Sequence, residues 1–198
     1  MPDLVLAAMP TSASVPLPIG TGGFMNPEVI VESFGLQPGM KVADFGSGSG
    51  YFTILMAKRV GSNGMVTALD IMESALETVR AKASAVGLKN LQTIRTDLEV
   101  FGGSALPDNS QNTVLLANIL FQSPKKDQII KEAKRVLAPG GLMIVIDWKK
   151  EANGGLGPPA ELKIDPEILR SMLEKEGLVF VSNIDAGAFH FGFIFRKS

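Results

Sequence analysis

The chain contains no cysteine and a single histidine among its 198 residues. Without cysteine, disulfide bonds, thiolate nucleophiles and cysteine-ligated metal ions are excluded. One histidine, His190, cannot by itself make a histidine-rich metal site. We therefore expect no bound metal ion, and the functional site must be sought among other residue types.

An excess of charge of one sign is also missing. The formal net charge is -1 at pH 7, so the protein has no global basic field that would attract nucleic acid. Local basic pairs such as Lys125-Lys126 and Lys149-Lys150 are more typical of solvated edges than of a phosphate-binding track. This balance argues against a nucleic-acid acceptor without excluding one.

Long hydrophobic runs are absent as well. The apolar residues 1–8 include Asp3, lack a basic leader and are too short to cross a bilayer. We expect neither a membrane span nor a signal peptide. We expect a cytoplasmic location. The content of 45% hydrophobic and 20% charged residues predicts a globular protein.

Proline and glycine divide the chain into two parts. Residues 1–23 contain four prolines and three glycines, which predicts an N-terminal arm without regular helix. The arm is either a disordered tail or a flap over the active site. Residues 24–198 are long enough for one domain with a full core.

Strands and helices are predicted to alternate through this domain. Apolar runs bounded by turns predict the strands, and apolar residues at helical spacing predict the helices. The expected strands are 41–45, 65–69, 91–95, 113–118, 142–146, 178–184 and one from about 189, and the expected helices start near 27, 51, 73, 123 and 166. The last two strands are joined by a short loop and should be antiparallel. The predicted fold is α/β, a doubly wound seven-stranded mostly parallel sheet with an antiparallel last strand.

The stretch from Val42 to Thr53 carries the first functional signal. A short apolar run ends in Asp44, three glycines follow at Gly46, Gly48 and Gly50, and the sequence then becomes helical. Glycine lets the backbone approach a ligand without a Cβ clash, and a helix N-terminus favours nucleotide-type ligands. We therefore predict a nucleotide-type ligand on this strand-to-helix turn.

Acid or amide residues also end four of the predicted strands: Asp44, Asp70, Asp97 and Asn118. The carboxyl ends of parallel strands share one edge of the sheet, where such folds bind ligands. A carboxylate at Asp70 can accept hydrogen bonds from both hydroxyls of a ribose.

Glycine spacing leaves the ligand partly open. A dinucleotide fingerprint reads Gly-x-Gly-x-x-Gly, whereas here the glycines alternate and position 51 is tyrosine. A nicotinamide-dependent oxidoreductase on a related fold is therefore an alternative. A non-catalytic protein that uses the same fold to bind a partner is another.

Over residues 25–195 the chain resembles class I S-adenosylmethionine-dependent methyltransferases, whose fold is Rossmann-like. The segments VADFGSGSGYFT, VTALDI and TDLE resemble that family's first three motifs, and AKRVLAPGGLMIVIDW resembles the stretch through its fifth strand. The motif order resembles ubiquinone/menaquinone-type small-molecule methyltransferases. The resemblance implies S-adenosylmethionine as cofactor and S-adenosylhomocysteine as product, with Asp97 near the adenine amino group and Leu98 against the ring. The implied cofactor-binding residues are Asp44, Phe45, Gly46, Ser47, Gly48, Gly50, Asp70, Ile71, Asp97, Leu98 and Asn118.

Departures from the family pattern bear on the acceptor. Asn118 is followed by Ile-Leu-Phe rather than Pro-Pro-Tyr, which argues against methylation of the amino groups of adenine or glutamine. Gln111 and Asn112 stand where phenylalanine and aspartate are usual. We expect a small or modest-sized acceptor, although a protein or nucleic acid is not ruled out by sequence.

Methyl transfer from a sulfonium is an in-line displacement, so the protein can act largely by positioning and by excluding water. A general base is optional, and the sequence identifies no catalytic residue. His190 is predicted to serve a structural role more readily than a catalytic one, and Asp147 and Trp148 to end a strand near the acceptor. The sequence does not indicate an oligomeric state.

Overall fold

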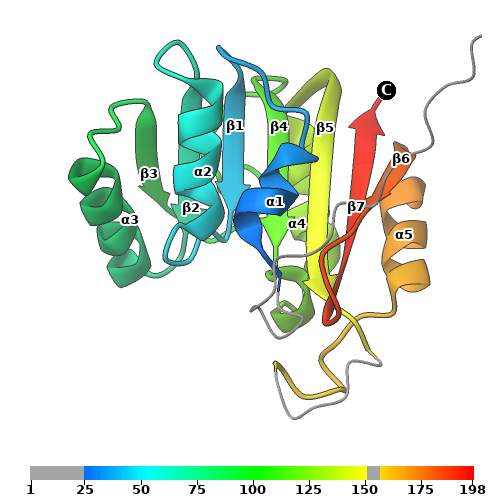
Figure 1. Ribbon diagram of the computed structural model, residues 1–198. Helices are drawn as coiled ribbons and strands as arrows, with labels where there is room; N and C mark the ends of the chain where they lie inside the picture. Colours follow the sequence, from blue (N-terminus) through cyan, green and yellow to red (C-terminus); the bar gives the residue numbers. More distant parts are fainter. Residues whose placement is uncertain (1–24, 151–156) are drawn as a thin grey trace, which may run out of the picture.

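The computed structural model describes residues 25–150 and 157–198. The predicted arm at 1–23 therefore lies outside the described residues. The described chain forms one seven-stranded sheet in the order β3-β2-β1-β4-β5-β7-β6, in which only the pairings of β7 are antiparallel (Figure 1). The strands are β1 (Lys41–Phe45), β2 (Met65–Asp70), β3 (Leu91–Arg95), β4 (Gln111–Ala117), β5 (Leu137–Trp148), β6 (Leu178–Ile184) and β7 (His190–Lys197).

Helices begin where the sequence supplies caps. The side chain of Asn26 accepts a hydrogen bond from the Glu28 amide, and Asp165 accepts from the amides of Glu167 and Ile168. A proline follows each of these caps, at the first helical position, where its missing N–H costs nothing. The helices are α1 (Pro27–Glu32), α2 (Tyr51–Val60), α3 (Glu73–Ala85), the 3-10 helix η1 (Leu120–Gln122), α4 (Lys126–Val136) and α5 (Pro166–Lys175).

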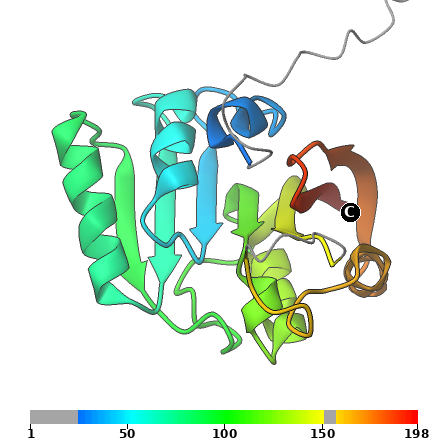
Figure 2. The ribbon, with the colours of Figure 1, turned by 60° about the horizontal axis from the view of Figure 1, so that its bottom comes forward.

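Two apolar layers cover the two faces of the sheet. One cluster packs α4 and α5 against side chains that include Val114, Leu116 and Phe193. The other packs α1 and α2 against side chains such as Val42, Leu115 and Ile144. Neighbouring residues of β4 thus point into different layers, as the alternation of a strand requires. Figure 2 shows α1 and α2 on one side of the sheet and α4 and α5 on the other.

Most predicted strand bounds are confirmed, and the differences have local causes. β5 begins at Leu137 rather than Leu142 because Pro139-Gly140-Gly141 forms an irregularity within the strand, where its register with β4 shifts. Helix α4 begins at Lys126 rather than at Ser123. Ser123 ends η1 instead, and its hydroxyl accepts the Lys125 amide at 3.0 Å.

A buried carboxylate organises the connection between β3 and β4. Glu132 of α4 is fully buried and accepts hydrogen bonds from the amides of Gly102 and Ser104, from the Ser104 hydroxyl and from Arg135. Burial alone would raise the pKa of Glu132, but these hydrogen bonds lower it to about 2. This network fixes residues 96–110 without a helix there.

The position where the family usually has aspartate, Asn112, also contributes to the fold. Its side-chain oxygen accepts a hydrogen bond from the Lys41 amide at 2.8 Å, which joins the start of β1 to β4. The amide side chain thus supports strand pairing at the edge opposite the carboxyl ends of these strands.

Within the described ranges, no helix has the length and apolarity needed to span a bilayer.

Candidate functional site

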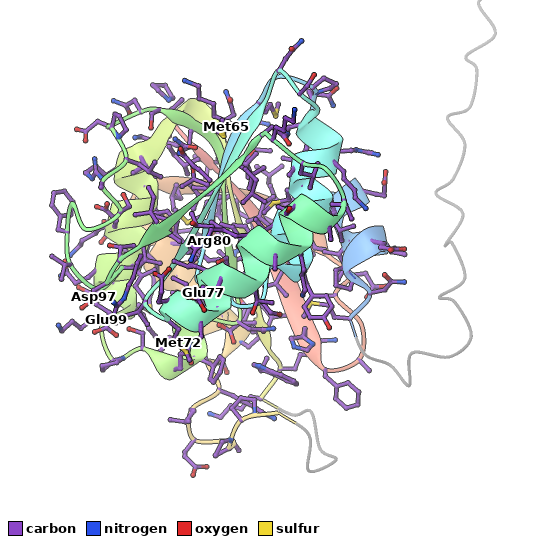
Figure 3. The ribbon with its side chains drawn as sticks, turned by 90° about the vertical axis from the view of Figure 1, so that its left-hand side faces the viewer. Met65, Met72, Glu77, Arg80, Asp97 and Glu99 are labelled. Atoms are coloured by element: carbon purple, nitrogen blue, oxygen red, sulfur yellow. The ribbon has the colours of Figure 1, made fainter. Side chains whose placement is uncertain are left out.

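A cavity of about 890 Å³ opens at the carboxyl ends of β1, β2, β3 and β4. This is the edge at which a doubly wound sheet binds its ligands. The parallel strands run toward the lower end of the molecule in Figure 1. Figure 3 places Met65, the first residue of β2, and Met72, just after the end of β2, at opposite ends of the sheet. The cavity lining includes Asp44, Gly46, Ser47, Gly48, Asp70, Ile71, Asp97, Leu98 and Asn118.

Backbone hydrogen bonds hold the glycine-rich loop against the end of β2. The amides of Gly46 and Ser47 both donate to the carbonyl of Leu69, at 2.8 and 3.0 Å. From α3, Lys82 donates to the carbonyl of Ser49 at 2.7 Å, and its Nζ lies 4.5 Å from the centre of the Tyr51 ring. The loop is therefore fixed from two sides before any ligand binds.

Two glycines of this loop are required for different reasons. Gly46 has φ +75°, and a Cβ there would lie 2.6 Å from Cδ1 of Ile119, so packing excludes a side chain. Gly48 has φ +50°, and no atom lies within 4 Å of the position that its Cβ would take. Because Gly48 lines the cavity, this open side of the backbone is free for a ligand.

The carboxylate of Asp70 is oriented by the loop. Oδ2 accepts a hydrogen bond from the Gly48 amide and Oδ1 from the Met72 amide, each at 2.9 Å. Each oxygen keeps further acceptor capacity, since a carboxylate offers about four lone-pair positions. Asp70 is half-buried, so it can present that capacity to the cavity.

Asp44 is more deeply placed. Its side chain is 2% exposed, and Oδ2 accepts a hydrogen bond from the Thr53 hydroxyl at 2.5 Å. Burial raises the pKa of Asp44 to about 7; the hydrogen bond from Thr53 opposes the rise and the nearby Asp70 carboxylate adds to it. A carboxyl group of this kind is close to half protonated at neutral pH.

Two further polar atoms on the cavity wall have no hydrogen-bond partner among the described residues: the hydroxyl of Ser47 and Oδ1 of Asn118. Asn118 has φ +54°, and its amide donates to the Ile146 carbonyl at 2.8 Å, so its backbone is fixed in the left-handed region. Buried polar groups are rarely left without a partner, so these two atoms indicate where a ligand would donate or accept.

The third strand brings a second carboxylate to the rim. Asp97 is exposed, and its Oδ1 accepts the amide of Glu99 at 2.9 Å, which closes the turn after β3. Leu98 is buried beneath the turn, while Ile71 is 59% exposed across the cavity. Figure 3 shows Asp97 and Glu99 together at the same end of the sheet as Met72.

Two residues of the predicted set do not line the cavity. Phe45 is fully buried in the apolar layer beneath α4, and Gly50 lies under Val79, where a Cβ would approach Cγ2 to 2.8 Å. Sequence reasoning missed other lining residues. Thr96 and Glu99 flank Asp97 and could have been found by proximity, and Phe52 lies within the first motif itself. Met25, Pro27, Gln122 and Ser123 come from distant segments that carry no motif.

The part of this sheet edge that β5 and β7 form lies outside the cavity lining. Asp147 is fully buried and accepts the amides of Trp148 at 2.8 Å and Phe121 at 3.1 Å, so it fixes η1. Burial raises the pKa of Asp147 to about 6, against the effect of these amides. Neither Asp147 nor Trp148 is among the residues that line the cavity.

His190, the first residue of β7, packs against Trp148 with ring centroids 4.0 Å apart. It is 2% exposed, and both ring nitrogens lack a hydrogen-bond partner within the described part of the chain. Burial, followed by the charges of Lys149 and Lys163, lowers the pKa of His190 to about 4. The imidazole is therefore neutral at physiological pH.

Comparisons with known proteins agree with this geometry. A ubiquinone/menaquinone biosynthesis C-methyltransferase from Shewanella sediminis is 34% identical over 121 residues, which are 61% of this chain and 47% of that protein. The chain thus spans about half the length of the curated relatives that it matches. Among solved structures, a SAM-dependent methyltransferase from Aquifex aeolicus has a TM-score of 0.80 at 29% identity, covering 89% of this chain and 92% of that one. A protein from Sulfolobus solfataricus that is described provisionally as a type 11 methyltransferase has a TM-score of 0.66 at 26% identity, covering 87% of this chain and 89% of that one.

A family model described as a methyltransferase domain matches residues 36–185, which include every strand from β1 to β6 and the glycine-rich loop. The chain therefore belongs to the methyltransferase domain family.

Proposed function

We propose that this protein binds S-adenosylmethionine in the cavity at the ends of β1 to β4 and transfers its methyl group to a small-molecule acceptor. The observation that carries the proposal is the pairing of Asp70 with Gly48. A carboxylate oriented by two backbone amides stands beside a glycine whose open side faces the cavity.

The residues present fit this cofactor. Asp70 can accept from the ribose hydroxyls, and Asp97 lies at the end of the adjacent strand, where it can accept from the adenine amino group. Ile71 and Leu98 offer apolar surface for a ring. The unpartnered Ser47 hydroxyl and Asn118 Oδ1 provide polar groups for the amino-acid part.

The chemistry that S-adenosylmethionine supplies when bound is an activated methyl group on a sulfonium. The chain contributes binding, orientation and exclusion of water. The loop is already fixed by Leu69 and Lys82, so little ordering is left to be done when the ligand binds. Holding two reactants in line can account for several kcal/mol of a barrier, roughly 7–11 in well-oriented cases.

For the acceptor, the relatives named above favour a small molecule, and the Shewanella protein is a C-methyltransferase by name. The cavity wall beside α1 and α2 includes Met25, Pro27 and Phe52, an apolar surface suited to an uncharged acceptor. We propose methylation at carbon of such a molecule. Incubation with phenolic, amine and thiol acceptors, followed by NMR to locate the new methyl group in each product, tests this. Methylation exclusively at oxygen, nitrogen or sulfur would contradict it.

Isothermal titration calorimetry with S-adenosylmethionine, S-adenosylhomocysteine and NAD tests the cofactor. We expect both sulfur ligands to bind and NAD to bind more weakly. The proteins named in the comparisons are methyltransferases, so they give no support to a nicotinamide-dependent reaction. Tighter binding of NAD than of either sulfur ligand would overturn the proposal.

Replacing Asp70 gives a residue-level test of the same site. Asp70→Ala should weaken S-adenosylhomocysteine at least tenfold, since charge-assisted hydrogen bonds are worth about 1.5–3 kcal/mol each. Glu77→Gln on the exposed surface of α3 removes the same charge outside the cavity lining and is the matched control (Figure 3). Equal affinities of the two variants would show that the ribose assignment is wrong.

A further inference from the structure

One feature of the cavity is unusual for a ligand site: a carboxyl group that is buried without a cationic partner. Asp44 is 2% exposed, and among the described residues its carboxyl group accepts a side-chain hydrogen bond from the hydroxyl of Thr53. A buried carboxylate without a cation is costly, and the group lowers that cost by holding a proton. Asp44 nevertheless lines the cavity, where a ligand can reach it.

The surrounding charges reinforce this state. Asp70 on β2 is a second carboxylate close enough to disfavour ionisation of Asp44, and Asp97 and Glu99 line the same cavity. The described residues that line the cavity include no lysine, arginine or histidine.

Two basic groups that contact residues of the cavity lining are already engaged. Lys82 of α3 is bound to the Ser49 carbonyl, and Lys125 pairs with Glu99 at 3.7 Å. On α2, Thr53 faces Asp44, whereas Lys58 and Arg59 lie in the last turn of that helix, away from its N-terminal end. The strands on either side of Asp44 contribute Ala68 and Leu115, which carry no charge.

We propose that Asp44 makes the cavity selective for positive charge on its ligand, because a cationic ligand displaces a proton from Asp44 whereas an uncharged one leaves the proton in place. The inference rests on the proposed function, since S-adenosylmethionine carries a sulfonium and an ammonium. Its ion pair with the Asp44 carboxylate replaces the proton as the compensating charge. Asp44 is then a specificity-determining residue, separate from the ribose and adenine contacts.

Proton release on binding gives a direct test that needs no acceptor. Calorimetry in two buffers of different ionisation enthalpy, at fixed pH, yields the number of protons released per ligand. With a pKa of about 7 for Asp44, we expect about 0.9 protons at pH 6 and about 0.5 at pH 7 for S-adenosylmethionine. The apparent affinity should rise roughly eightfold between pH 6 and pH 7.5.

A matched ligand separates charge from shape. 5′-Methylthioadenosine has the same adenosine part but neither the sulfonium nor the ammonium. We expect it to bind without proton release and with a flat pH profile. Equal proton release with this ligand would overturn the selection by charge.

Three variants locate the proton. Asp44→Asn should abolish proton release and flatten the pH dependence for S-adenosylmethionine, while Glu77→Gln, on the exposed surface of α3 and outside the cavity lining, should leave both unchanged. Thr53→Val removes the hydrogen bond that opposes protonation of Asp44, so proton release should persist to higher pH. Unchanged release in Asp44→Asn would overturn the assignment.

The two proposals fail in different ways. If S-adenosylmethionine does not bind at all, the proposed function falls. If it binds to the wild-type protein at pH 6 without releasing a proton, the cofactor assignment stands and only the role of Asp44 is wrong.

Discussion

Two buried aspartates end two parallel strands of this sheet, and they serve opposite purposes. Asp147, at the end of β5, accepts the amides of Phe121 and Trp148 and does not line the cavity. Asp44, at the end of β1, accepts a hydroxyl from Thr53 and lines it. Burial raises the pKa of both, to about 6 and about 7.

The difference shows that burial and a perturbed pKa do not by themselves distinguish a ligand-binding acid from a structural one. What separates them is the use of their oxygens. Asp147 accepts hydrogen bonds from backbone amides of η1 and of the next residue. The chain after Asp44 is a glycine-rich loop whose amides donate to the Leu69 carbonyl and to Asp70 instead. The acid that the backbone leaves underused is the one available to a ligand.

The largest effect should come from removing the structural acid. Asp147→Ala leaves the amides of Phe121 and Trp148 without their partner, and we expect the free energy of unfolding to fall by about 2–4 kcal/mol at pH 6. Chemical denaturation measures it. Asp185→Ala, which removes an exposed side chain that accepts the Gly187 amide, is the control and should cost well under half as much. Similar losses in both variants would remove the distinction between the two acids.

The ligand-facing acid should give the opposite sign. The folded protein holds the Asp44 proton up to about pH 7, while the unfolded chain releases it near 3.8, so the free energy of unfolding falls as pH rises through this window. Asp44→Asn lacks this loss and should be more stable than wild type at pH 8, by about 2 kcal/mol. Thermal or urea denaturation at pH 5 and pH 8 measures it. Asp127→Asn, at an exposed position of α4, keeps Asp44 and should follow the pH dependence of wild type. A destabilised Asp44→Asn at pH 8 would contradict the comparison.

A smaller contrast is expected within the glycine loop. Gly46→Ala forces a Cβ against Ile119 in addition to the cost of its positive φ, whereas Gly48→Ala carries only the conformational cost, about 1–2 kcal/mol. Gly46→Ala should therefore be the less stable variant. Gly48→Ala should lose affinity for S-adenosylhomocysteine although its loss of stability is the smaller of the two, because Gly48 lines the cavity. If Gly48→Ala binds as well as wild type, the cavity side of Gly48 does not contact the ligand.

The smallest effect at neutral pH concerns His190, which packs against Trp148 at the end of β5. His190 is the one histidine, so its ring resonances need no assignment, and they should titrate near pH 4. Because the folded pKa lies below that of the unfolded chain, His190 reduces stability only as the pH falls below about 6.5. Trp148→Ala uncovers the ring and should move its pKa toward the ordinary value. A wild-type pKa near 6.5 would show that the imidazole is solvated.

Local patterns in the sequence were sufficient for most of the fold. The bounds of β1, β3 and β6 and the caps at Asn26 and Asp165 follow from alternation, proline and capping side chains, which act over a few residues. The alternation of strands and helices predicts a mostly parallel sheet whose one edge carries Asp44, Asp70, Asp97 and Asn118.

Features that depend on distant residues could not be predicted. Glu132 lies in an amphipathic helix. Nothing in the sequence around it indicates that its side chain is buried and accepts hydrogen bonds from the amides of Gly102 and Ser104. The sequence gives no sign that Asp147 and Asp44 differ in their partners, because one donor to Asp147, the amide of Phe121, comes from η1, more than twenty residues earlier. Phe45 belongs to the predicted cofactor-binding set because it lies within the first motif. A strand places alternate side chains on opposite faces, however, and the side chain of Phe45 is buried in the core.

The contact between Trp148 and His190 also gives the protein a built-in optical probe. The chain has one tryptophan, and its indole packs 4.0 Å from the imidazole and close to Gly157, beyond the end of β5. An imidazolium quenches indole emission more strongly than a neutral imidazole does. The intrinsic fluorescence of this protein should therefore report from a single position at the end of β5, and it should dim in acid as His190 takes up its proton.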